Sequence, residues 1–160
     1  MRLCGTPLYA ALLLAALGVS LPAWAQSDEG DVLKTVQRTF DAMAAHDGVA
    51  LYEVFLPEAT IVGVMPGGRT RSLRGDEFIQ RSVSSQERVQ ERIWDAMVSV
   101  NGGVATLVAP YDFHREGKFS HCGVDAVTLL KSSTGWRISH IFFTMQTRGC
   151  PASPLGKPKP

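Results

Sequence analysis

The chain has 160 residues, with 16 Lys and Arg side chains against 15 Asp and Glu side chains. This length suffices for one domain with its own hydrophobic core. Charges of both signs are spread along the chain without a basic stripe, which argues against nucleic acid or an anionic membrane surface as the partner.

The first 25 residues have the features of a cleavable signal peptide. Arg2 is the only charge before Asp28, an apolar run follows it, and Ala23-Trp24-Ala25 places small residues at the −3 and −1 positions of a cleavage site. The alternative is a membrane anchor, but the apolar run is shorter than the ~20 residues that span a bilayer. We therefore expect cleavage after Ala25, a periplasmic or secreted protein, and no membrane attachment after cleavage.

Two helices are predicted next. Apolar residues recur with helical spacing over 33–44, Ser27 is placed to cap the helix, and Gly48 is expected to take the left-handed conformation that ends it. A short second helix presents Leu51, Val54 and Phe55 on one face, and Pro57 closes it.

The rest of the chain has mostly strand character. A β-rich segment over 60–65, a turn and a short return strand over 69–73 precede a third helix opened by Gly75. Tight turns then separate four long predicted strands, over 88–100, 104–115, 119–131 and 136–146. Sequential strands joined by tight turns predict an antiparallel meander. We expect one domain over residues 26–150, followed by a disordered, proline-rich tail over 151–160.

Helices that precede a sheet indicate an α+β fold with the helices on one face. A long, bent sheet wrapped over helices also leaves a natural pocket between the two layers.

Two cysteines remain after signal cleavage, Cys122 and Cys150, because Cys4 leaves with the signal. In an oxidising compartment such a pair usually forms a disulfide. The alternative, a redox or metal-binding pair, has no C-x-x-C spacing and no third ligand nearby to support it.

Several stretches resemble members of the nuclear transport factor 2-like superfamily, which are cone-shaped α+β barrels. They are Val36-Gln37-Arg38, Ala45-His46-Asp47-Gly48, residues 55–60, Leu73-Arg74-Gly75, Tyr111-Asp112-Phe113, residues 120–125 and Gly135-Trp136-Arg137-Ile138. The later stretches are most similar to exported bacterial members of the SnoaL-like or putative lumazine-binding type. The resemblance implies a cone of three N-terminal helices packed in a curved antiparallel sheet, but the superfamily hosts enzymes, binders and scaffolds alike.

Ketosteroid isomerases of this fold use a tyrosine, an aspartate base and a protonated late-strand aspartate. The resemblance places Thr39 and Gly63 at the first two positions, and only Asp125 matches the third. Steroid-type isomerisation is therefore disfavoured.

Strand alternation suggests which residues line the cone. If Asp125 points inward, as the resemblance implies, we expect three alternating sets to share the concave wall, namely Thr106, Val108, Pro110, Asp112 and His114; Gly123, Asp125, Val127 and Leu129; and Arg137, Ser139, Ile141 and Phe143. His114 could shuttle a proton while Asp112 orients it, although both could instead be solvated at the rim.

Asp125 lies within an apolar strand pattern and should be paired or protonated, with Arg137 as a natural partner. His121 is expected on the convex face or near the disulfide. The four histidines have no spacing typical of a metal site, so no metal is expected.

Three functions remain open. The first is an exported, non-catalytic domain that binds a small apolar or aromatic molecule through Asp112, His114, Asp125, Ser139 and Phe143. The second is a lyase or isomerase that uses His114 with Asp125 or Asp112 as acid and base. The third is a structural or interaction module that forms a homodimer through the sheet. No cofactor is expected, because an exported protein has no access to cytosolic nucleotide cofactors.

Overall fold

Three helices and seven strands make up the part of the chain that the computed structural model describes, residues 23–158. In chain order they are α1 Ala23–Ala45, α2 Gly48–Val54, β1 Phe55–Val64, β2 Thr70–Arg74, α3 Gly75–Ser84, β3 Val89–Ile93, β4 Met97–Asn101, β5 Val104–Arg115, β6 Lys118–Ser132 and β7 Gly135–Thr144. The α+β class is as predicted. Arg2, Cys4 and the apolar run of the expected signal peptide lie outside the described residues.

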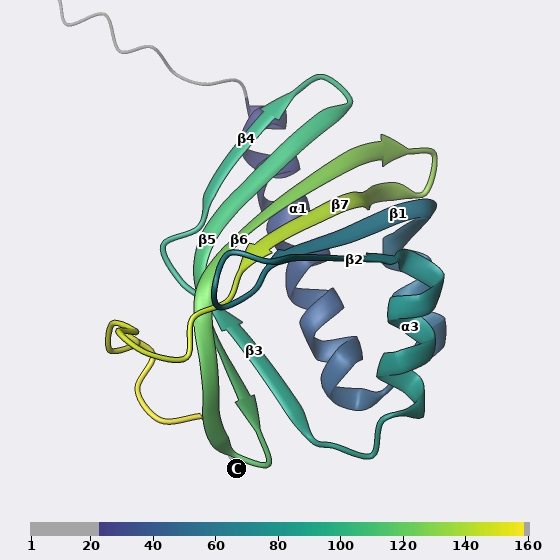
Figure 1. Ribbon diagram of the computed structural model, residues 1–160. Coiled ribbons are helices and arrows are strands. Elements are labelled where there is room, and N and C mark those ends of the chain that lie inside the picture. The colour runs from purple at the N-terminus through teal and green to yellow at the C-terminus, as the bar shows by residue number, and fades with distance from the viewer. Residues whose placement is uncertain (1–22, 159–160) are drawn as a thin grey trace, which may run out of the picture.

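All strands join one curved, open sheet with the order β2-β1-β7-β6-β5-β3, and β4 also pairs with β5. The antiparallel arrangement was predicted for the whole sheet, but β1 runs parallel to β7, so the sheet is mixed. The sheet bends around α1 and α3, which lie in its concavity and give the domain its cone shape (Figure 1).

The junction of α1 and α2 differs from the prediction in its residues. His46, with φ of 54°, takes the left-handed conformation that was expected of Gly48. Asp47 then caps α2, because its side chain accepts a hydrogen bond of 3.0 Å from the Ala50 amide. At the other end, α1 begins at Ala23 rather than at Ser27.

The long strand expected over residues 88–100 is in fact two strands, β3 and β4, which pair with different halves of β5. Residues 94–96 lie between them, opposite Pro110, which has no amide hydrogen to donate to a neighbouring strand. Asp95 has φ of 46°, and the Trp94 amide donates to the Pro110 carbonyl. The extra residue in this break reverses which side chains face inward on the two sides of it.

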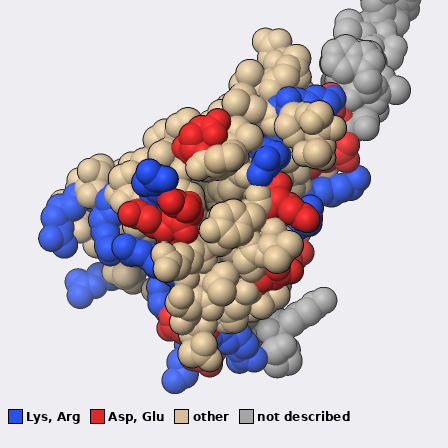
Figure 2. All heavy atoms as spheres, turned by 90° about the vertical axis from the view of Figure 1, so that its right-hand side faces the viewer, with Lys and Arg blue, Asp and Glu red and all other residues tan. Residues whose placement is uncertain are grey.

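The hydrophobic core joins all three helices to the sheet. Val32 and Val36 of α1 pack there with Leu51, Leu107 and other fully buried side chains. No helix among residues 23–158 is long and apolar enough to cross a membrane. On the α3 side of the molecule, acidic and basic side chains are interspersed over a mostly uncharged surface (Figure 2).

The C-terminal segment after β7 crosses the outer side of the sheet, away from the helices (Figure 1). A disulfide joins Cys150 to Cys122 of β6, with the two Cα atoms 5.9 Å apart. Residues 151–158 contain no helix or strand, but the Gly156 carbonyl accepts a hydrogen bond of 3.1 Å from Arg92 of β3. This segment therefore covers part of the outer face.

Candidate functional site

A cavity of about 380 Å³ lies between the helices and the inner face of the sheet. Its walls are mainly apolar and come from both layers, with Val36, Phe40, Ile61, Val127, Ile141 and Phe143 among the lining side chains. This size and polarity are typical of a site for a small organic molecule.

Two carboxyl groups meet in this cavity. Glu91 of β3 and Asp125 of β6 both line it and lie close enough for each to perturb the pKa of the other. Their strands are not neighbours, and the curvature of β5 between them brings the side chains together. Two carboxylates cannot donate to each other, so a hydrogen bond between these groups requires a proton on one of them.

Burial is the main cause that raises both pKa values. It raises the pKa of Asp125, whose residue is only 2% exposed, to about 7, and hydrogen bonding to Glu91 partly opposes this shift. The pKa of Glu91 lies well above its ordinary value through burial, then through the charge and hydrogen bond of Asp125 and the charge of Asp112. Near neutral pH the pair therefore holds a proton.

Tyr111 and His121 add two further polar groups to the lining. The Tyr111 hydroxyl donates a hydrogen bond of 2.9 Å to the Thr144 carbonyl, and burial followed by the charges of Glu91 and Asp125 raises its pKa. His121 stacks on Phe113 with ring centroids 4.7 Å apart.

Burial, followed by the charge of Arg115, lowers the pKa of His121 to about 4. His121 is therefore a neutral hydrogen-bonding group at physiological pH. Its placement corrects the expectation that it lies on the convex face. The alternation that places Asp125 inward also places His121 inward.

The exposed lining residues mark the opening of the cavity. Arg81 of α3 and Arg115 of β5 lie there, and Arg115 forms an ion pair with Glu87. His46 also lines this end, with its Nδ1 atom 2.7 Å from the Ser82 carbonyl oxygen. Among these residues at the mouth the basic groups thus outnumber the one carboxylate, Glu87, while the carboxyl groups of Glu91 and Asp125 lie deeper.

Two glycines allow close approaches beside the cavity. A Cβ atom on Gly63 of β1 would overlap the Phe143 ring, and one on Gly123 of β6 would overlap the Thr144 carbonyl. Gly63 is the residue that the isomerase resemblance places at the base position, and here the Phe143 ring covers it. At that position the chain therefore has room for the Phe143 ring and no carboxylate that could act as a base.

The structure divides the predicted site residues between the two faces of the sheet. Asp125 and Phe143 line the cavity. Asp112 and His114 do not, because Ala109 and Tyr111 pair directly with inward-facing positions of β6, and the intervening set of β5 faces outward. The expectation that the set from Thr106 to His114 lines the cone is therefore wrong.

Ser139 was also expected in the wall, but it lies at an irregularity in the pairing of β6 with β7. Its hydroxyl donates a hydrogen bond of 3.1 Å to the Thr128 carbonyl, and it is absent from the lining. Arg137, the expected partner of Asp125, instead donates to the carbonyls of Tyr52 and Phe55.

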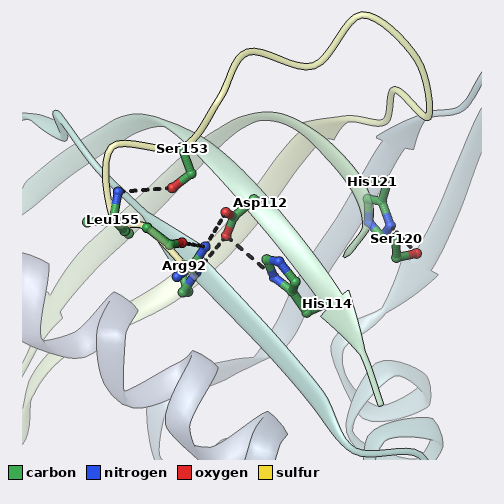
Figure 3. Close-up of polar contacts among 8 residues, drawn as sticks. Arg92, Asp112, His114, Ser120, His121, Ser153 and Leu155 are labelled. Atoms are coloured by element: carbon green, nitrogen blue, oxygen red, sulfur yellow. Dashed lines mark hydrogen bonds and ion pairs between the residues drawn. The ribbon is translucent and has the colours of Figure 1, made fainter. Parts of the chain in front are cut away.

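On the outer face, Asp112 forms a two-point ion pair with Arg92, with contacts of 2.9 Å and 2.5 Å (Figure 3). His114 lies 3.7 Å from the same carboxylate, and burial lowers its pKa. His114 and Asp125 thus lie on opposite sides of the sheet and cannot act on one bound molecule.

Sequence reasoning missed Glu91. The available signal was the alternation of Val89, Glu91 and Ile93, which places an acid between two apolar residues on one face. Among residues 23–158, no cluster of three or more His, Cys, Asp or Glu side chains is arranged to hold a metal ion.

Known proteins resemble this chain mainly in fold. A dehydratase described as putative, from the nuclear transport factor 2-like family of Streptomyces avermitilis, superposes with a TM-score of 0.63 at 18% identity, over 76% of this chain and 97% of that one. A protein of unknown function from Mycobacterium tuberculosis gives 0.67 at 17% identity, over 81% and 78%. A protein with a cystatin-like fold from Novosphingobium aromaticivorans gives 0.62 at 16% identity, over 78% and 85%.

No curated protein matches the chain. The family described as "Putative lumazine-binding" matches residues 27–144, which is most of the described domain. The chain therefore belongs to this family, and its fold is the one seen in solved structures of the nuclear transport factor 2-like superfamily.

Proposed function

We propose that this protein binds a small, largely apolar or aromatic molecule in the cone cavity, without catalysing a reaction, and that it does so outside the cytoplasm. The observation that carries the proposal is the apolar cavity of about 380 Å³ with its few convergent polar groups, Glu91, Asp125, Tyr111 and His121. The family description, which refers to binding of a small molecule, supports the same function.

Binding without catalysis is favoured because His114, the residue expected to act as acid or base with Asp125 or Asp112, does not line the cavity. His114 is held on the outer face beside Asp112, so it is not part of the cavity. Thr39 stands where the isomerase resemblance places the tyrosine. Its hydroxyl donates a hydrogen bond of 3.0 Å to the Thr35 carbonyl within its own helix. A lyase or isomerase built on His114 and Asp125 has no geometric support.

A cavity-filling substitution tests binding. Ile141→Trp fills the lumen, whereas Phe142→Trp changes the adjacent residue, whose side chain lies on the outer face and is 47% exposed. The probe is the neutral fluorescent dye N-phenyl-1-naphthylamine. We expect the lumen variant to weaken dye binding about tenfold or more and the control variant to leave it unchanged. Equal binding by both variants, or none by the unsubstituted protein, would reject a functional cavity.

Export is part of this proposal and has its own test. Mass spectrometry of the protein expressed with all 160 residues should find a periplasmic or secreted form that begins at Gln26. Recovery of the unprocessed chain from the cytoplasm would contradict it.

A second candidate function is homodimer formation through the outer face of the sheet. Val104, Val124, Leu130 and Phe142 have exposed apolar side chains on β5, β6 and β7, with exposed fractions of 38–49%. Exposed apolar groups on one face are typical of an interaction surface. Sedimentation at micromolar concentration should show a dimer that Val124→Lys dissociates, and a monomer would exclude this candidate.

A further inference from the structure

The inner part of the cavity is acidic and contains an acceptor without a donor. Asp125 Oδ2 is fully buried and has no hydrogen-bond partner among the described residues. Building on the proposed function, we propose that the ligand carries a protonated amine or amidine, which Glu91 and Asp125 bind together while its apolar body fills the rest of the cavity.

The first argument is that this carboxyl pair has no basic partner within the described chain. Arg92, which follows Glu91 in β3, pairs with Asp112 on the outer face, and Arg137, which was expected to pair with Asp125, binds the carbonyls of Tyr52 and Phe55 instead. A buried acceptor without a donor is costly, so a donor supplied by a ligand would be strongly favoured.

The second argument is electrostatic. After burial, which is the largest cause for both groups, the charges of Glu91 and Asp125 raise the pKa of Tyr111, and the charges of Asp125 and Asp112 raise that of Glu91. The potential in this part of the cavity is thus negative whenever the pair loses its proton. An organic cation replaces that proton and allows both carboxyl groups to ionise, with charge-assisted hydrogen bonds to each.

The third argument comes from the surrounding side chains. His121 is neutral at physiological pH, so it adds no positive charge that would oppose a cation. Tyr111 and Phe143 present aromatic rings to the lumen, and aromatic faces attract cations. An apolar cation therefore finds suitable contacts for both its charge and its body.

The charges at the opening set the orientation of such a ligand. Arg81 and Arg115 lie there, with Glu87 paired to Arg115 and the imidazole of His46 beside them. Positive groups at the mouth disfavour a cation that stays there. The ligand should therefore enter with its charged group leading toward the carboxyl pair.

An isosteric pair of probes tests this inference on the protein purified with its disulfide intact. The cation is 2-naphthylmethylamine and the neutral control is 2-naphthylmethanol, measured by isothermal titration calorimetry at about pH 7. We expect the amine to bind about tenfold or more tighter than the alcohol, since hydrogen bonds between charged groups are worth at least this factor. Titrations in buffers of different ionisation enthalpy should show that amine binding releases a proton.

Glu91→Gln and Asp125→Asn should each abolish the preference for the amine while alcohol binding persists. Asp41→Asn, which removes an exposed acid on α1, should leave the preference unchanged. Retained binding of the alcohol shows that a variant is folded. If the unsubstituted protein binds the alcohol as tightly as the amine, the inference is wrong while the proposed function stands. If neither probe nor the dye binds, both are wrong.

Discussion

Replacing Asp125 by asparagine should change how the free energy of unfolding depends on pH. The folded-state pKa of Asp125, about 7, lies above its ordinary value of 3.8. The unfolded chain therefore ionises first as pH rises. Stability from this carboxyl is fully present below about pH 4 and is lost as pH rises through about 7.

The magnitude follows from the shift. A difference of roughly 3 units at ~1.4 kcal/mol each is at most about 4 kcal/mol, because Glu91 shares the proton. The asparagine in Asp125→Asn does not ionise, so the variant does not lose this stability as the pH rises. Its free energy of unfolding should therefore rise relative to that of the unsubstituted protein between about pH 4 and about pH 7.

Urea unfolding followed by tryptophan fluorescence, at fixed ionic strength and without reductant, measures both profiles. Asp41→Asn is the matched control, because it removes an exposed aspartate and should leave the profile unchanged. A difference between the Asp125→Asn and unsubstituted profiles that stays constant across the pH range would refute a shared, buried proton.

Three other substitutions test the surroundings of the cavity by urea unfolding. Cys150→Ala should cost about 3–4 kcal/mol in the chain-entropy account, because its disulfide joins residues 28 apart in sequence. Asp112→Ala should cost roughly 3–5 kcal/mol, because it leaves the Arg92 guanidinium without its carboxylate beneath the C-terminal segment. Gly63→Ala should cost about 1–3 kcal/mol, because the new methyl group meets the Phe143 ring.

Each of these has a matched comparison. Reduction of the unsubstituted protein should destabilise it as much as Cys150→Ala does. The double variant Arg92→Met/Asp112→Leu should recover most of the stability lost in Asp112→Ala, since it removes both charges. Gly103→Ala, at a site with no atom within 4 Å of the added methyl group, should be nearly neutral. Equal losses at both glycines would mean that the contact with Phe143 is unimportant.

The fold could be predicted because its elements carry clear periodic patterns. Residues 104–115 and the third helix agree with the prediction, since each has flanking turn residues and a continuous apolar face. The break at Trp94–Ala96 could not be predicted, because it depends on Pro110 in a strand that follows later in the chain. If residues 88–100 are read as one continuous strand, the inward positions of its second half, Val98 and Val100, place Glu91 on the outer face. The break reverses this alternation and turns Glu91 inward.

The site was only partly predictable for a related reason. Tyr111, Asp112, Phe113 and His114 are all buried, so burial alone does not indicate which pair faces the cavity. Tyr111 and Phe113 line the cavity, while Asp112 and His114 face outward, where Arg92 pairs with Asp112 and also binds the C-terminal segment. Asp112 and His114 are residue types that suit a catalytic or binding site. The same types also form buried structural ion pairs, so the sequence alone does not distinguish the two roles.

The parallel pairing of β1 with β7 constrains how the protein can be made. β7 lies between β1 and β6 in the sheet, although it is the last strand in the chain. A nascent chain without residues 135–144 therefore has two unpaired strand edges and an open core. Folding must wait for long-range closure between the first and last strands, which is intrinsically slow. The sheet therefore cannot be completed until the chain has been synthesised through Thr144.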